Sequence, residues 1–127
     1  MTNTLRTALY AIRTSALITV RVEMKGKVGM TKVPYYYDGE EDGIHSIRPS
    51  SGTGEIIFLS EKSEIRVDEH SIRINGVWLQ LWRCKKIERQ NEFVVINKDQ
   101  LQFQSGDRES AYDYIGANGG FVYKLDK

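Results

Sequence analysis

The sequence predicts a mainly β fold, an antiparallel β-barrel or sandwich of about seven or eight strands with two short helices. Two observations carry this prediction. Short segments with alternating apolar and polar residues follow one another from Gly54 to Ser105, and Asn75-Gly76 lies between two of them. Asn-Gly between alternating segments is a strong hairpin signal, because both residues tolerate the positive φ of a type I′ turn. A third observation, helical spacing near each end of the chain, adds a helix at 1–16 and another near 108–115.

The first element is an N-terminal helical segment over 1–16, with a capping side chain at Thr2, Asn3 or Thr4. Its apolar side chains recur at three- and four-residue spacing: Leu5, Ala8, Leu9, Ile12 and Ala16. Leu17 to Lys25 then alternates strictly, which predicts a half-buried strand. A turn follows, and Val28 to Tyr37 returns as a strand. Because Pro34 has no N–H to donate, this strand lies at an edge or ends near Val33.

Residues 38–54 are predicted to form one long, solvated and mobile loop. The segment contains Gly-Glu-Glu-Asp-Gly and then a second stretch rich in Ser, Gly and Pro. Such residues favour turns over regular elements. Loops of this length in compact domains are usually functional or disordered. We therefore expect this loop to be the segment that reaches a partner.

A meander of short strands follows, then a helix and a last strand. The predicted strands are Glu55–Ser60, Glu64–Asp68, Ser71–Ile74, Val77–Cys84, Phe93–Asn97 and Leu101–Gln104. The helix covers 107–115 with Asp107 as its cap. The stretch Ala117-Asn118-Gly119-Gly120 breaks it, and Phe121 to Leu125 forms the final strand.

The Asn75-Gly76 hairpin also predicts a register. If these two residues form the turn, Ile74 pairs with Val77 and Ile72 pairs with Leu79, so these four side chains share the core face. Arg73 then faces Trp78 on the opposite face. Trp78 and Trp82 must be covered there either by a second layer of this chain or by another subunit, and the sequence leaves both alternatives open.

Composition places the chain among ordinary globular domains, and 127 residues predict one domain over 1–127. The hydrophobic content is 40%, the charged content is 28%, and the net charge is +1. A charge so close to zero creates no global field towards nucleic acid or membrane. The single cysteine excludes an internal disulfide framework. The sequence contains no stretch of about 18 uninterrupted apolar residues, so it predicts no transmembrane helix.

Residues 1–22 contain three arginines and no acidic residue, a composition similar to that of a mitochondrial presequence. The alternative is an ordinary N-terminal helix that runs into a strand. We favour the alternative, and we expect a protein of the cytoplasm or of a virion, without a secretory signal peptide and without mitochondrial import.

Candidate chemistry is sparse. Asp68, His70 and Cys84 have the residue types of a nucleophilic triad, but a buried structural cysteine and a turn histidine are the more ordinary interpretation. The acidic run Glu40-Glu41-Asp42 has carboxylates for a hard cation, yet it lacks EF-hand spacing and reads as solvated charge. The glycine clusters match neither phosphate-loop nor dinucleotide-binding spacing. We expect no enzymatic activity, no catalytic residues, no cofactor and no metal.

Two groups of residues are typical of binding surfaces. Aromatic and basic residues near the central hairpin have the types that stack bases or bind anions. Three consecutive tyrosines precede the predicted loop, and tyrosine is enriched in protein interfaces. The interface candidates are Tyr35, Tyr36, Tyr37, Arg73, Trp78, Trp82, Lys85 and Lys86.

Two resemblances concern pattern alone. Ile65 to Ile115, with its short strands, Asn75-Gly76 hairpin and following helix, resembles a pleckstrin-homology-like module. The opening helix Leu5-Arg6-Thr7-Ala8-Leu9-Tyr10-Ala11 followed by a β-barrel is similar to small neck and tail proteins of tailed phages.

We expect a non-enzymatic structural protein, a subunit of a larger assembly, most concretely a small neck- or tail-type component of a tailed-phage virion. Its expected partners are other protein subunits, in a homo-oligomer or a multi-protein assembly. The alternative is a monomeric module of the pleckstrin-homology-like or oligonucleotide-binding kind that binds nucleic acid, lipid or peptide. Nucleic acid ranks below protein as a partner, and no membrane partner is expected.

Overall fold

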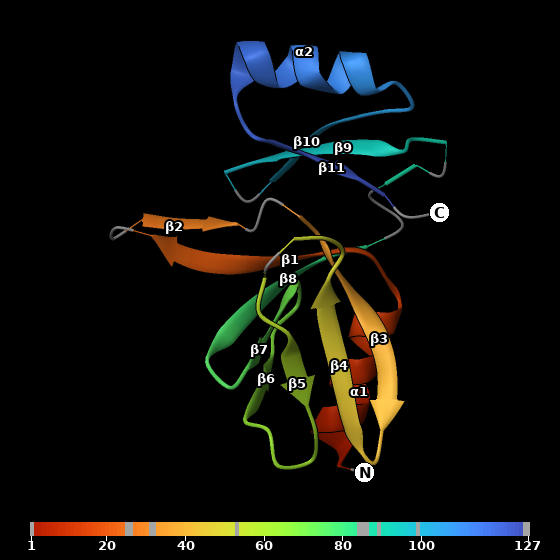
Figure 1. Cartoon of the computed structure of the whole chain (residues 1–127), viewed down its shortest axis with the longest axis vertical. Coiled ribbons are helices and arrows are strands. Elements are labelled where there is room, and N and C mark those ends of the chain that lie inside the picture. Colours follow the sequence, from red (N-terminus) through yellow and green to blue (C-terminus); the bar gives the residue numbers. More distant parts are fainter. Residues whose placement is uncertain are drawn as a thin grey trace. The chain divides into compact units, whose positions relative to one another are not determined.

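The computed structural model describes residues 2–24, 27–30, 33–52, 54–83, 87–88, 90–98 and 100–125. The chain divides into two compact units, residues 1–82 and 83–127. The fold is mainly β, as predicted: an antiparallel half-barrel, a separate three-stranded sheet, an N-terminal helix and a C-terminal helix (Figure 1).

The first unit begins with α1 (Asn3–Arg13), as the sequence predicts. Thr2 is the N-cap, and its hydroxyl accepts a hydrogen bond from the Leu5 N–H at 3.2 Å. The strands are β1 (Ser15–Met24), β2 (Lys27–Met30), β3 (Tyr35–Glu41), β4 (Ile44–Pro49), β5 (Ile57–Leu59), β6 (Ile65–Val67), β7 (Ser71–Ile74) and β8 (Val77–Arg83). Seven of them form the half-barrel in the order β5-β4-β3-β1-β8-β7-β6, and β2 pairs with the far part of β1.

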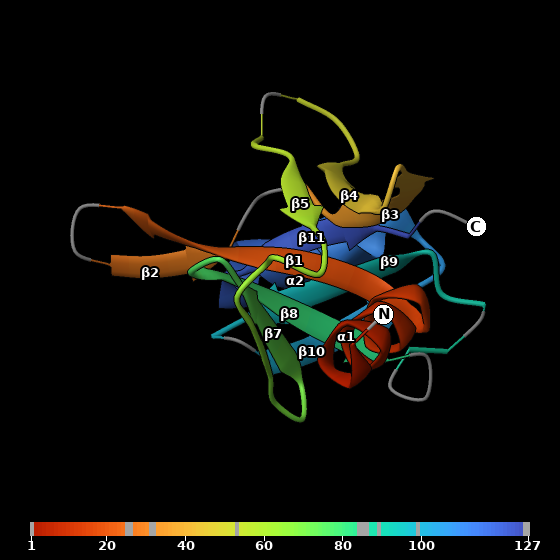
Figure 2. The same ribbon diagram turned by 90° about the horizontal axis from the view of Figure 1, so that it is seen from below.

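The core of this unit lies between α1 and the inner side of the half-barrel. Leu5, Leu9 and Ile12 of the helix belong to the same buried cluster as the inward-facing strand residues. Those strand residues include Ile18, Val20, Ile47, Leu59, Ile72, Ile74, Leu79 and Leu81. Figure 2 shows the helix close to end-on beside the curved sheet. The period of two in the strands and the helical spacing at 1–16 therefore meet in one core.

The central hairpin has the predicted register. Ile74 pairs with Val77, Arg73 with Trp78, and Ile72 with Leu79. Asn75 and Gly76 have φ values of 49° and 87°, as a type I′ turn requires. Asn75 is also held from outside the turn, because its side-chain oxygen accepts a hydrogen bond from the Glu64 N–H at 2.9 Å.

Two sequence predictions in this unit are wrong. Residues 38–54 are not one long loop: β3 continues to Glu41, and β4 begins at Ile44. A two-residue turn at Asp42-Gly43, with φ values of 53° and 81°, joins the strands. The second concerns Val28–Tyr37, predicted as a returning strand that lies at an edge or ends near Val33: it is two strands, β2 and β3, with Pro34 between them, and β3 lies inside the strand order and not at an edge. Proline removes a ladder hydrogen bond, which explains the break.

The second unit contains β9 (Phe93–Asn97), β10 (Gln100–Ser105), α2 (Arg108–Asn118) and β11 (Phe121–Lys124). The strand order is β10-β9-β11, and α2 packs along this sheet (Figure 1). Asp107 caps α2 as predicted: its carboxylate accepts hydrogen bonds from the Ser110 hydroxyl and the Glu109 N–H, which lower its pKa. The helix continues three residues beyond the predicted end, and Gly119 follows with a φ of 80°. None of the described helices is long and apolar enough to cross a membrane.

Candidate functional site

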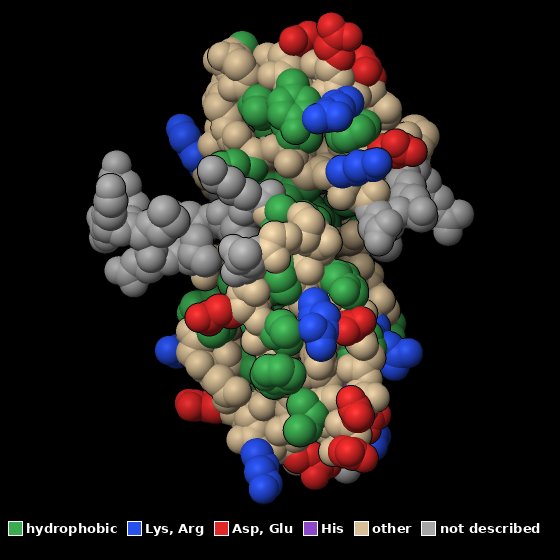
Figure 3. Space-filling view, viewed as in Figure 1, with side chains coloured by type: hydrophobic (Ala, Val, Ile, Leu, Met, Phe, Trp, Pro, Cys, Tyr) green, Lys and Arg blue, Asp and Glu red, His purple; other side chains and the backbone are tan. Residues whose placement is uncertain are grey.

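Four exposed apolar side chains lie on the outer side of β3, β4 and the β5 segment, and we call them the β3–β5 patch. They are Tyr36, Ile44, Ile56 and Phe58, which are 43%, 47%, 37% and 53% exposed. Figure 3 shows hydrophobic side chains on this part of the surface. Such residues are typical of interfaces when they gather on one face.

Strand pairing explains why these side chains lie together. Tyr36 pairs with Arg48, and Ser46 pairs with Phe58. The intervening residues His45 and Ile47 point inward and are buried. Alternation therefore places the patch outside and the core inside. Arg48 forms an ion pair with Asp38, so charge within the patch is neutralised in the chain itself.

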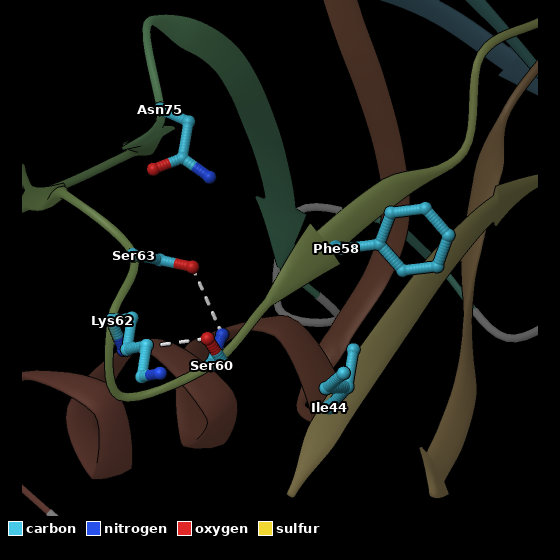
Figure 4. A pocket seen from close by; sticks show the side chains of 6 residues that line it. All are labelled: Ile44, Phe58, Ser60, Lys62, Ser63 and Asn75. Carbon is cyan, nitrogen blue, oxygen red and sulfur yellow. Dashed lines mark hydrogen bonds between the residues drawn. The ribbon is translucent and has the colours of Figure 1, made fainter.

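A shallow pocket of about 400 Å³ adjoins the patch (Figure 4). Ile44 and Phe58 line one side of it, and Asn75 and the 60–63 turn line the other. The turn is ordered by its own hydroxyls: Ser63 accepts a hydrogen bond from the Ser60 N–H at 3.0 Å, and Ser60 accepts one from the Lys62 N–H at 3.3 Å. The pocket thus joins an apolar wall to a polar turn with one cation, Lys62.

A second surface, which we call the Arg–Trp cluster, lies on the outer side of β1, β7 and β8. The Cζ atoms of Arg21 and Arg73 lie 5.9 and 5.8 Å from the centre of the Trp78 ring, so both guanidiniums are within cation–π range. The Arg21 Nη2 group also donates a hydrogen bond to the Gln80 side-chain oxygen at 2.9 Å. Arg73 is exposed, and Trp78 is half-buried.

The cluster carries positive charge without an internal counter-ion. Within the described part of the chain, neither Arg21 nor Arg73 has a carboxylate partner. The neighbouring Arg66, which pairs with Arg73 across the strands, has one: its Nε lies 3.8 Å from a carboxylate oxygen of Asp68. Two guanidiniums on an aromatic ring can bind a carboxylate or a phosphate.

The predicted interface candidates are divided by the structure. Tyr35 is buried, and this burial, with a smaller effect from Glu55, raises its pKa. Tyr37 points inward, where its hydroxyl is 2.8 Å from Nδ1 of the buried His45. Tyr36 is therefore the exposed member of the tyrosine run.

Near the hairpin, Trp82 is 4% exposed and donates a hydrogen bond from Nε1 to the Thr19 hydroxyl at 3.1 Å. Trp82 is thus buried in this structure and is hydrogen-bonded to β1. Trp78 keeps an exposed part and stacks with Arg73, as the register predicts. Lys85 and Lys86 lie outside the described residues.

The candidate triad is not assembled among the described side chains. Cys84 lies outside them, Asp68 pairs with Arg66, and the acidic partner nearest His70 is Glu69, with 3.6 Å between Nε2 and Oε1. In the part of the chain that the structure covers, no group of three or more His, Cys, Asp or Glu side chains could hold a metal ion.

Sequence reasoning missed Arg21 and the Ile44–Phe58 part of the patch. Alternation places Arg21 on the polar side of its strand, but no local sequence pattern predicts that β1 pairs with β8. Comparison with known proteins adds no relative: no family model matches, and neither curated proteins nor solved structures give a match.

Proposed function

We propose that this chain is a non-enzymatic structural protein, a subunit of a larger assembly. Its most concrete form is a small neck- or tail-type component of a tailed-phage virion. The β3–β5 patch is the observation that carries the proposal. Tyr36, Ile44 and Phe58 are large apolar side chains on one sheet face, and water contact with them is unfavourable.

The position of the patch strengthens this argument. β5 stands at one end of the strand order, and among the described strands it pairs only with β4. An edge strand offers backbone groups to another chain unless it is covered or charged. A subunit in an assembly would cover both the edge and the apolar side chains beside it. The order of elements, a helix followed by a half-barrel, supports the neck- or tail-type form of the proposal.

Light scattering after size-exclusion chromatography tests the proposal on the full chain. We expect a mass above that of the monomer, or entry into a larger particle when candidate partners are present. A Phe58→Thr, Ile44→Thr double variant should weaken self-association by more than about tenfold, since it removes two apolar side chains that the proposed interface would bury. Tyr112→Gln, at a residue 48% exposed on α2, is the matched control and should leave the mass unchanged. A stable monomer that joins no particle contradicts the proposal.

The Arg–Trp cluster favours a second candidate, a monomeric pleckstrin-homology-like or oligonucleotide-binding module for nucleic acid, lipid or peptide. Trp78 supplies a stacking surface, and Arg21 and Arg73 supply positive charge beside it. A monomer with salt-dependent binding to single-stranded DNA or to vesicles of anionic lipid would support this function. Affinity that is unchanged in Trp78→Ala would remove it.

A further inference from the structure

The turn between β3 and β4 concentrates negative charge at one end of the first unit. Glu40, Glu41 and Asp42 are exposed and follow one another at the turn. Among the described residues none of the three forms an ion pair with a basic side chain, and Arg48 of β4 is paired with Asp38. We call these three residues the acidic turn. Its conformation is fixed by Asp42 and Gly43, both with positive φ.

The Arg–Trp cluster lies at the opposite end of the β1–β3 pair. Ile18 of β1 pairs with Tyr35 of β3, and the strands are antiparallel. Arg21 lies three residues from this point in one direction, and the acidic turn begins five residues away in the other. At about 3.3 Å per residue the two charged groups are about 25 Å apart along the strands. This distance exceeds the Debye length of about 8 Å at physiological salt, so neither group neutralises the other within one chain.

We propose that the acidic turn of one copy docks on the Arg–Trp cluster of the next copy. The inference rests on the proposed function, since it names the partner as a second copy of this chain. The turn brings three carboxylates, and the cluster has the exposed guanidinium of Arg73 and the half-buried one of Arg21, neither with a carboxylate partner among the described residues. Carboxylates and guanidiniums form charge-assisted hydrogen bonds, often in bidentate pairs.

The side chains that neighbour the two charged groups are also complementary, because both are apolar. Glu41 pairs with Ile44 across the β3–β4 hairpin, so an exposed apolar side chain accompanies the acidic turn. The half-buried ring of Trp78 accompanies the arginines. Docking would bury Ile44 against an aromatic surface and would exclude water from the ion pairs, which strengthens them.

Such an interface joins two different surfaces and is therefore heterologous. After the first contact, one copy keeps an unused cluster and the other keeps an unused turn, so a further copy can bind at either end. Repetition closes into a ring if the rotation between copies allows it, and otherwise continues as a filament.

A phosphate backbone is the competing occupant of the cluster, and the charges favour the second copy. The chain has a net charge of only +1, so no overall field draws a polyanion to the cluster. Nucleic-acid affinity depends mainly on the number of phosphate contacts, and two arginines provide few.

Charge exchange tests the docking. We compare Arg73→Glu with a Glu40→Lys, Glu41→Lys double variant, because all three side chains are exposed and their replacement leaves the core intact. Each variant alone should self-associate more than about tenfold more weakly than the wild type by light scattering. An equimolar mixture should recover the assembly, because each lost contact then has a complementary partner. Arg108→Glu is the matched control: Arg108 is exposed and stacks on Tyr112 at 5.3 Å, and its reversal should change nothing.

Three outcomes overturn the inference. Unchanged assembly in both charge variants, with loss of assembly in the Ile44/Phe58 double variant, rejects the docking and keeps the proposed function. A wild type that stays monomeric alone, but enters a particle with other proteins, also rejects the docking and keeps the function. A monomer that binds a single-stranded oligonucleotide, with binding lost in Arg73→Glu, rejects both and favours the second candidate. Circular dichroism of each variant confirms that it is folded before these outcomes are compared.

Discussion

The β7–β8 and β3–β4 hairpins close with the same kind of turn but differ in what surrounds it. Asn75-Gly76 and Asp42-Gly43 both have positive φ at both positions. Both hairpins lie within the strand order and bury their inward residues, Ile72 and Leu79 in β7–β8 and His45 and Ile47 in β3–β4. The β3–β4 turn is acidic and exposed. The comparison teaches that the same turn geometry closes both hairpins, whereas the residues beside it give one hairpin an acidic, exposed end.

The largest expected difference is between the inward side of the β7–β8 hairpin and the outward side of the β3–β4 hairpin. Leu79→Ala should lower the free energy of unfolding by about 3 kcal/mol, because it removes buried methyl groups and leaves a cavity. Ile44→Ala, at a residue 47% exposed, should change it by less than about 0.5 kcal/mol. Urea unfolding followed by tryptophan fluorescence measures both, since Trp78 and Trp82 both belong to the first unit. Equal losses would contradict this division of roles.

The same comparison explains what the sequence could predict. Around Asn75-Gly76 three local features predict the same hairpin register: the turn residues, the alternation of Ile and Leu with polar residues, and the side of the strands that faces the core. The register, the strand order from β6 to β8 and the helix cap at Asp107 follow from such local agreement. For the same reason Arg73 and Trp78 were placed correctly beside each other.

The β3–β4 hairpin was missed because its local signals disagree. Residues Asp38 to Asp42 are acidic or glycine, and such residues are depleted in strands. The strand forms because pairing with β4 and burial of Tyr37 and His45 override that preference. Arg21 was missed for another reason: the β1–β8 pairing joins segments far apart in the chain and has no local signal.

The inner side of the β3–β4 hairpin offers a second comparison, between adjacent tyrosines. Tyr37→Phe should cost about 1 to 2 kcal/mol of unfolding free energy, because it leaves Nδ1 of the buried His45 without its 2.8 Å partner. Tyr36→Phe, on the exposed side of the same strand, should cost less than about 0.5 kcal/mol. Thermal unfolding of the two variants measures the difference. A larger loss in the Tyr36 variant would mean that the inward and outward sides are assigned wrongly.

The smallest expected effect concerns the turns themselves. Gly76 and Gly43 have φ values of 87° and 81°, and a Cβ added at either would meet no atom within 4 Å. Alanine at either position should therefore cost only its backbone strain, about 1 kcal/mol in each hairpin. Urea unfolding of Gly76→Ala and Gly43→Ala should give equal losses, although one turn belongs to the core hairpin and the other to the acidic hairpin. A difference of more than about 1 kcal/mol would show that turn strain depends on the surrounding strands, because local strain alone predicts equality.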